Sequence, residues 1–145
     1  MTLPIAPGHR FSRTFQFTPE EVKRFSLAAG DTNPLHLDEA FAAKSLYGRL
    51  IASGTHSSSI LLGLTASHFS EYHAVVGVTF TVNFKRAVYA DELVHVEWTV
   101  QAMKPHRSGT SHFVEMTGAL RDGAGQDCVT ATGTVLVTFS TQETP

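Results

Sequence analysis

The stretch Val-Thr-Phe-Thr-Val-Asn-Phe-Lys at residues 78–85 alternates apolar and polar side chains at every position. A period of two is typical of a strand with one buried and one exposed face. Three further apolar faces of this kind follow: Val94, Val96, Trp98 and Val100; then Val114, Met116 and Leu120; then Val129, Ala131, Val135, Val137 and Phe139. Turn signals separate them at residues 91–92, 105–109 and 122–125. The C-terminal half is therefore predicted to be an antiparallel sheet.

A helix is predicted upstream of these strands, between Thr18 and Gly30. Thr18 is a suitable N-cap, Pro19 suits the first helical position, and Glu21 completes a capping box. Gly30 supplies the stop. The face that turns inward is expected to contain Val22, Phe25 and Ala29, which recur at helical spacing.

Two more helices and one more strand complete the expected pattern. Asp38 marks the start of a short second helix, and a third helix runs from about Gly54 to Phe69. The apolar face of this third helix contains Ile60, Leu61 and Leu64. Alternation at residues 11–17 indicates a strand before the first helix. We predict an α+β fold in which the long helix covers a curved antiparallel sheet and Trp98 belongs to the core.

The bulk composition is that of a globular protein. The 145 residues suit one domain, 1–145, with 42% hydrophobic and 17% charged residues. The net charge of -2 comes without a basic block, which argues against nucleic acid as a partner. No window approaches the roughly 20 apolar residues of a membrane span, and residues 1–8 lack the features of a signal peptide. The lone Cys128 suits a reducing compartment, so a cytoplasmic location is expected.

Residues 30–38 concentrate polar side chains around Pro34, at a junction between two predicted helices. Spacing alone favours a structural interpretation. In that interpretation Asp31 and Asn33 cap turns and His36 binds a backbone carbonyl. Asp38 caps the following helix.

A calcium site in the same segment is excluded by its spacing. His36 stands at position six, where calcium loops need glycine, and Ala42 stands at position twelve, where a bidentate Glu is required. Two histidine pairs elsewhere lack partner ligands at metal-site spacing: His106 with His112, and His68 with His73. We therefore expect no metal.

Residues 25–42 read Phe-Ser-Leu-Ala-Ala-Gly-Asp-Thr-Asn-Pro-Leu-His-Leu-Asp-Glu-Ala-Phe-Ala and resemble the signature of the MaoC-like, (R)-specific enoyl-CoA hydratases. The resemblance extends through residues 48–56, Gly-Arg-Leu-Ile-Ala-Ser-Gly-Thr-His, which are similar to the start of that family's central helix. It implies a hotdog fold, an acyl-CoA substrate without a further cofactor, and a homodimer or dimer of dimers with a pantetheine tunnel at the subunit boundary.

The resemblance also implies catalysis by Asp31 and His36. Adding water to a trans-2-enoyl-CoA needs a base for the attacking water and an acid for C2. Asp31 is expected to be mainly the base that orients and deprotonates the water. His36 is expected to bind the same water and to help pass the proton to C2. Asn33 is a supporting residue that fixes the loop.

The start of the third helix is the expected binding site for the thioester oxygen. By resemblance the backbone N–H of Gly54 binds the carbonyl, helped by the helix dipole. Ser53 and His56 flank this glycine and are candidate substrate-binding residues. They depart from the His-Gly-Met that many hydratases show here, and His56 either lines the pocket or packs.

Two other functions remain as alternatives. A hotdog acyl-CoA thioesterase normally carries a catalytic carboxylate on the central helix, but residues 55–67 contain no Asp or Glu. A non-catalytic acyl-CoA-binding subunit is disfavoured because Asp31 and His36 are both present. The basic residues that could meet CoA phosphates are Lys44, Arg49, Lys85 and Arg86. The acyl chain and the physiological direction remain open.

Overall fold

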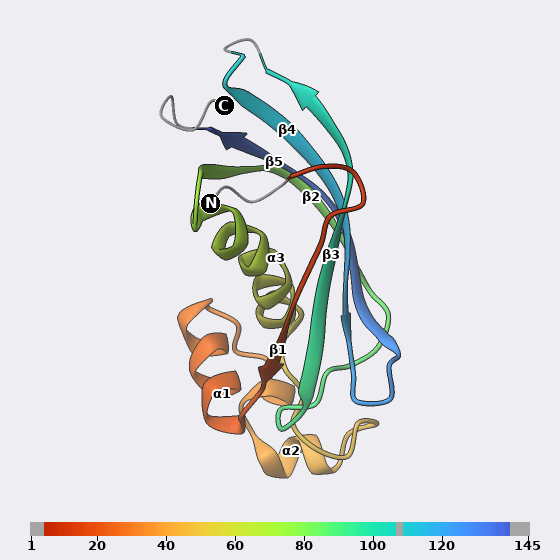
Figure 1. Ribbon diagram of the computed structural model, residues 1–145. Helices are drawn as coiled ribbons and strands as arrows, with labels where there is room; N and C mark the ends of the chain where they lie inside the picture. Colours follow the sequence, from red (N-terminus) through yellow and green to blue (C-terminus); the bar gives the residue numbers. More distant parts are fainter. Residues whose placement is uncertain (1–4, 107–108, 140–145) are drawn as a thin grey trace.

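The computed structural model describes residues 5–106 and 109–139 (Figure 1). Five strands form one antiparallel sheet in the order β1-β3-β4-β5-β2. The strands are β1 (Arg10–Gln16), β2 (Ala74–Phe84), β3 (Leu93–Pro105), β4 (Ser111–Arg121) and β5 (Asp127–Thr138). The helices are α1 (Pro19–Ala28), α2 (Glu39–Ala43) and α3 (Gly54–Ser70), with a 3-10 turn η1 (Pro34–His36) between α1 and α2. The predicted α+β fold is confirmed.

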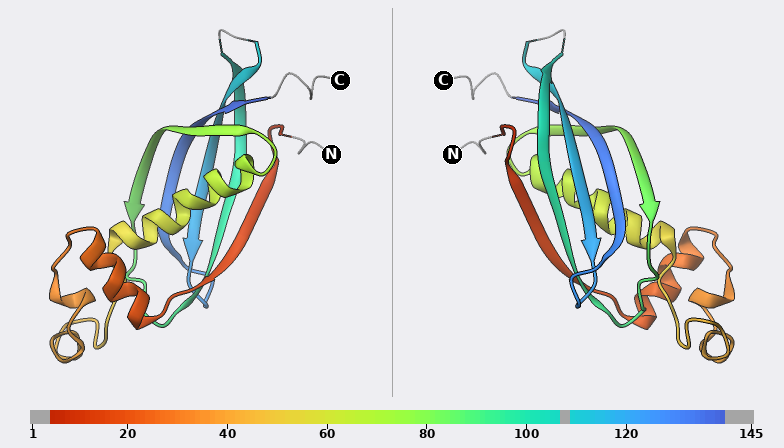
Figure 2. Two further views of the ribbon diagram at one scale, coloured as in Figure 1. Left: turned by 90° about the vertical axis from the view of Figure 1, so that its left-hand side faces the viewer. Right: turned by 90° about the vertical axis from the view of Figure 1, so that its right-hand side faces the viewer.

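The sheet curves around α3, and the three shorter helical elements gather beside the N-terminal end of α3 (Figures 1 and 2). Trp98 of β3 joins the two layers, because its indole Nε1 donates a hydrogen bond to the carbonyl oxygen of Leu61 at 2.8 Å. Both side chains are fully buried. A buried indole N–H needs an acceptor, so this bond fixes where the helix lies on the sheet.

Two glycines make room for large aromatic rings inside the sheet. Gly118 lies opposite Trp98, and Gly133 lies opposite Phe80 on the neighbouring strands. A Cβ at Gly118 would come within 2.5 Å of the Trp98 ring, and one at Gly133 within 2.3 Å of the Phe80 ring. Both positions therefore need glycine for packing rather than for backbone freedom.

The helix caps follow the sequence. The Thr18 Oγ1 accepts from the Glu21 N–H at 3.3 Å, and the Asp38 carboxylate accepts from the Phe41 N–H at 3.0 Å. Cys128 is fully buried in the core. No helix in the described ranges is both long and apolar enough to span a bilayer.

Ala29 and Val78 do not lie on the faces predicted for them. Ala29 is the exposed C-cap of α1, and Ser26 takes the inward position instead. In β2 a bulge between Gly77 and Thr79 breaks the alternation, so that Val78 is 52% exposed. The predicted turn at residues 105–109 includes residues 107 and 108, which lie outside the described residues.

Replacing Gly118 with alanine is expected to destabilise the protein by about 1–3 kcal/mol, because the new methyl group overlaps the Trp98 ring. Thermal unfolding followed by the fluorescence of Trp98, the only tryptophan, measures this change. Gly123→Ala is the matched control, since nothing lies within 4 Å of its Cβ position. Equal melting temperatures for the two variants would contradict the packing role of Gly118.

Candidate active site

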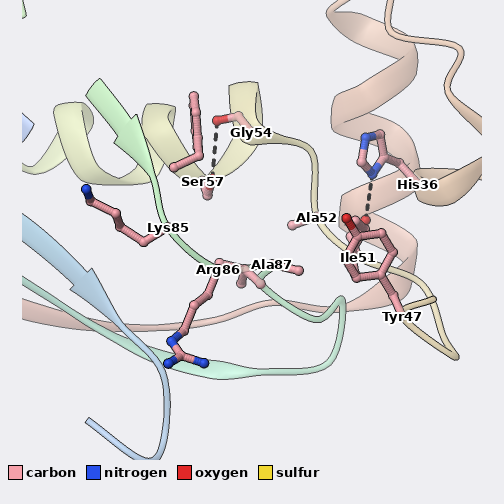
Figure 3. A pocket seen from close by; sticks show the side chains of 11 residues that line it. His36, Tyr47, Ile51, Ala52, Gly54, Ser57, Lys85, Arg86 and Ala87 are labelled. Carbon is pink, nitrogen blue, oxygen red and sulfur yellow. Dashed lines mark hydrogen bonds between the residues drawn. The ribbon is translucent and has the colours of Figure 1, made fainter. Parts of the chain in front are cut away.

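A cavity of about 310 Å³ opens beside the N-terminal end of α3. Its walls come from η1, from the segment before α3, and from the segment that joins β2 to β3 (Figure 3). The lining residues are His36, Tyr47, Ile51, Ala52, Gly54, Ser57, Phe84, Lys85, Arg86, Ala87 and Val88. Two of the predicted site residues, His36 and Gly54, therefore face the same space.

His36 is held in one orientation by its backbone and by its ring. The Asn33 side chain caps η1 by accepting from the Leu35 N–H at 3.0 Å, and Pro34 occupies the first position of the turn. The His36 residue is 6% exposed, and its ring Nδ1 lies 2.8 Å from the carbonyl oxygen of Ile51. A carbonyl oxygen only accepts, so Nδ1 carries the hydrogen and Nε2 of the neutral ring keeps its lone pair.

Asp31 uses its two carboxylate oxygens differently. Oδ1 accepts from the Asn33 N–H at 3.0 Å, which is the turn-capping role that spacing suggests. Oδ2 lies 3.7 Å from Nε2 of His36, too far for a direct hydrogen bond but close enough for one water to contact both atoms. Asp31 is absent from the lining of the cavity, yet its side chain is 30% exposed. Asp31 and His36, which the sequence predicts to act as a pair, therefore lie within reach of one shared water molecule.

The start of α3 offers hydrogen-bond donors to the cavity. Ser53 is fully buried and caps the helix, because its Oγ accepts from the His56 N–H at 3.1 Å. The first N–H groups of a helix have no intrahelical acceptor. The N–H of Gly54, the first residue of α3, can therefore donate to a ligand. The Phe84 ring lies so close that a Cβ on Gly54 would come within 2.9 Å of its Cε1. Ser53 thus acts as a helix cap, and Gly54 lies at the cavity wall.

His56 packs on the other side of α3. Its ring stacks on Phe25 with centroids 4.3 Å apart and meets the edge of Phe17 at 4.9 Å. Burial lowers the pKa of His56, and the nearby Glu21 carboxylate only partly opposes this shift. The ring is therefore a neutral packing group, and it is not among the residues that line the cavity.

The basic residues separate into two groups. Lys85 and Arg86 line the cavity, whereas Lys44 and Arg49 do not. Arg49 instead lies over the Tyr89 ring, 3.6 Å from its centroid. Within residues 5–106 and 109–139, no three His, Cys, Asp or Glu side chains converge as metal ligands would.

Sequence reasoning missed Tyr47 and Phe84 as cavity residues. Tyr47 lies in an irregular loop without a pattern, and Phe84 looks like one more inward residue of an alternating strand. Phe84 is the last residue of the edge strand β2, where it is 58% exposed and its ring lies against Gly54. A pattern along the chain carries no information about which strand forms an edge.

The chain is similar to known hydratases and dehydratases. It is 30% identical over 122 residues to the (R)-specific enoyl-CoA hydratase of Aeromonas caviae, a match that covers 82% of this chain and 89% of that protein. It is 29% identical over 92 residues to the 3-hydroxybutyryl-CoA dehydratase of Methylorubrum extorquens, covering 63% of this chain and 58% of that protein.

Its fold is similar to that of a solved MaoC-like dehydratase from Rhodospirillum rubrum, with a TM-score of 0.80, 26% identity and 94% of each chain covered. The family model described as the MaoC like domain matches residues 4–121, which include η1, α3 and the first four strands. The hotdog fold that the resemblance implies is therefore confirmed, and the chain belongs to the MaoC-like dehydratase family.

Proposed function

We propose that this protein is an (R)-specific enoyl-CoA hydratase, which reversibly adds water in the syn sense to a trans-2-enoyl-CoA and, in reverse, dehydrates the 3-hydroxyacyl-CoA. The observation that carries the proposal is the distance of 3.7 Å between Oδ2 of Asp31 and Nε2 of His36, both available as acceptors. Family membership and the similarity to two enzymes of this reaction class support it.

One water molecule satisfies both acceptors. It donates one hydrogen to the Asp31 carboxylate and the other to Nε2 of His36, so that an oxygen lone pair is directed at C3 of the alkene. The new C3–O bond takes the hydroxyl group, and the proton that leaves the water is taken by the pair and returned to C2. All atoms of the water are then in the product, and the reaction needs no oxidant or reductant. In this scheme Asp31 is mainly the base: Oδ2 takes the proton from the water, and the proton moves across to Nε2 of His36, 3.7 Å away. Nε2 then releases this proton to C2, so that both residues return to their starting states.

The thioester oxygen gains negative charge as water attacks. The Gly54 N–H at the positive end of α3 stabilises this charge, and the missing side chain lets the carbonyl approach. Gly54 and His36 both line the same cavity. A conjugated thioester bound at Gly54 then presents its double bond to the water.

Thioester hydrolysis is the competing reaction of the same substrates. The lining of the cavity contains no Asp or Glu, and α3 carries none along Gly54–Ser70. A carboxylate that attacks the carbonyl or activates water against it is thus missing from the helix where such an enzyme needs it. A non-catalytic acyl-CoA-binding subunit is the other alternative, and it differs by showing no turnover.

Asp31→Asn and His36→Gln are each expected to slow hydration of crotonyl-CoA by about 10²–10⁴-fold, because each variant removes one proton acceptor from the water. The loss of the enoyl-thioester absorbance measures the rate. Asp38→Asn is the matched control: it makes the same chemical change seven residues away, and asparagine still caps α2. Full activity in either site variant would show that the assigned pair is wrong.

A thiol-trapping reagent in a parallel reaction separates hydration from hydrolysis. Hydration removes the enoyl band without releasing CoA, whereas a thioesterase releases CoA thiol and a binding subunit does neither. Cys128 adds no background, because burial raises the pKa of its thiol to about 11. Release of CoA at the rate of substrate loss would overturn the hydratase assignment.

We further propose that two chains form a homodimer by pairing their β2 strands. β2 is an edge strand of the sheet and presents unpaired backbone groups. Val76 and Val78 on this strand are 61% and 52% exposed, which is unusual for an edge left in water. Because β2 runs into the cavity at Phe84, a second chain there would complete the wall of the cavity.

The cytoplasmic location expected from the sequence stays a prediction.

Val78→Lys is expected to convert the dimer to a monomer, since charged side chains on an edge strand oppose strand pairing. Light scattering after size exclusion should give twice the chain mass of 15.7 kDa for the natural protein and one chain mass for the variant. Leu93→Lys is the control, because Leu93 is similarly exposed at 54% but lies on β3, away from the β2 edge. A monomeric natural protein would rule out this dimer.

A further inference from the structure

The cavity beside α3 has an unbalanced charge. Its lining contains two cationic side chains, Lys85 and Arg86, and no Asp or Glu. Most other basic residues in the described ranges are paired with carboxylates; these pairs are Arg10–Glu97, Lys23–Glu39, Arg24–Glu20, Arg49–Asp91, Lys104–Glu115 and Arg121–Asp127. Neither cavity cation is paired with a carboxylate from residues 5–106 or 109–139. Two adjacent unpaired cations in one cavity indicate an anionic ligand.

The backbone holds this cationic pair in place. The N–H groups of Lys85 and Arg86 both point to the carbonyl oxygen of Cys128, at 2.8 and 3.2 Å. Cys128 itself is fully buried in the core at the start of β5. The positions of the two residues are therefore fixed, while their side chains are exposed and free to bind.

The two charges lie away from the reacting atoms. In Figure 3 the side chains of Lys85 and Arg86 extend away from His36, which is at the opposite end of the cavity. An anion bound there is thus separated from the water between Asp31 and His36. The substrate must carry its negative charge on a handle that spans this separation.

The pantetheine arm of a thioester substrate is such a handle, because it joins the reacting carbonyl to a phosphate. Lysine supplies a compact charge and arginine a planar fork that binds two phosphate oxygens. We propose that Lys85 and Arg86 form the binding site for the 4′-phosphate of the substrate's phosphopantetheine. This assignment rests on the proposed function. CoA and acyl carrier proteins share this phosphate, so the site recognises the group common to both.

The test compares three thioesters that share the crotonyl group: crotonyl-CoA, crotonyl-4′-phosphopantetheine and crotonyl-pantetheine, which has no phosphate. Lys85→Gln and Arg86→Gln are each expected to raise KM for the first two about tenfold, the effect of losing one charged hydrogen bond. kcat should stay within about twofold, and KM for crotonyl-pantetheine should not change. Lys44→Gln removes an exposed charge outside the cavity and should change none of these values.

Other results overturn the assignment. An equal rise in KM for crotonyl-pantetheine would mean that the substitutions disturb the cavity itself. A rise in KM confined to crotonyl-CoA would mean that the residues bind the nucleotide part instead.

Crotonyl-loaded acyl carrier protein distinguishes the two sources of the phosphate. A matching rise in KM for this substrate shows that the same residues bind a protein-bound phosphopantetheine. No rise limits the site to free thioesters of CoA type. The phosphate site is overturned for CoA and for acyl carrier protein alike if neither substitution raises KM for any of the phosphate-containing thioesters.

Calorimetry separates this proposal from the hydratase assignment. Binding of free CoA and of 4′-phosphopantetheine requires no turnover, so it can be measured even if the protein hydrates none of the thioesters. Weaker binding in Lys85→Gln and Arg86→Gln, with unchanged binding in Lys44→Gln, supports the phosphate site whatever the reaction. Equal affinity in all four proteins refutes the site and leaves the function of Asp31 and His36 unaffected.

Discussion

The hydrogen bond from Nδ1 of His36 to the carbonyl oxygen of Ile51 is the interaction on which the site depends. It fixes the ring and also its tautomer, because the carbonyl can only accept. The lone pair of the neutral ring is thereby placed on Nε2, facing Oδ2 of Asp31. A ring held only by packing could present either nitrogen, and the water between the two residues would lose one of its acceptors.

The core determines where the Ile51 carbonyl lies. The segment before α3 is tied to the segment between β2 and β3, since the Ala52 N–H donates to Val88 at 2.8 Å and the Ala90 N–H donates to Leu50 at 3.0 Å. α3 is in turn fixed on the sheet by the bond between Trp98 and Leu61. A continuous set of contacts therefore runs from the middle of the sheet to His36. Such support keeps reacting groups near their productive geometry.

Sequence patterns predicted the features that depend on neighbours along the chain. Strand alternation and helix caps depend only on residues that are close in sequence. The structure has the predicted caps at Thr18 and Asp38. The bulge that exposes Val78 depends on pairing with β5 and has no signal in the sequence. Likewise the cover of Gly54 by Phe84 follows from the edge position of β2. Spacing alone assigned Asp31 to turn capping, and Oδ1 does cap; only the resemblance pointed to the free Oδ2.

The hydrogen bond to the Ile51 carbonyl sets the tautomer of His36. Long-range ¹H–¹⁵N correlation spectra of the ¹⁵N-histidine protein, with the His36 signals assigned by their loss in His36→Gln, report which ring nitrogen carries the hydrogen. We expect a neutral His36 ring with the hydrogen on Nδ1 and a bare Nε2. A neutral ring protonated at Nε2 would contradict it, because the bond to Ile51 and the acceptor for the water would then both be absent.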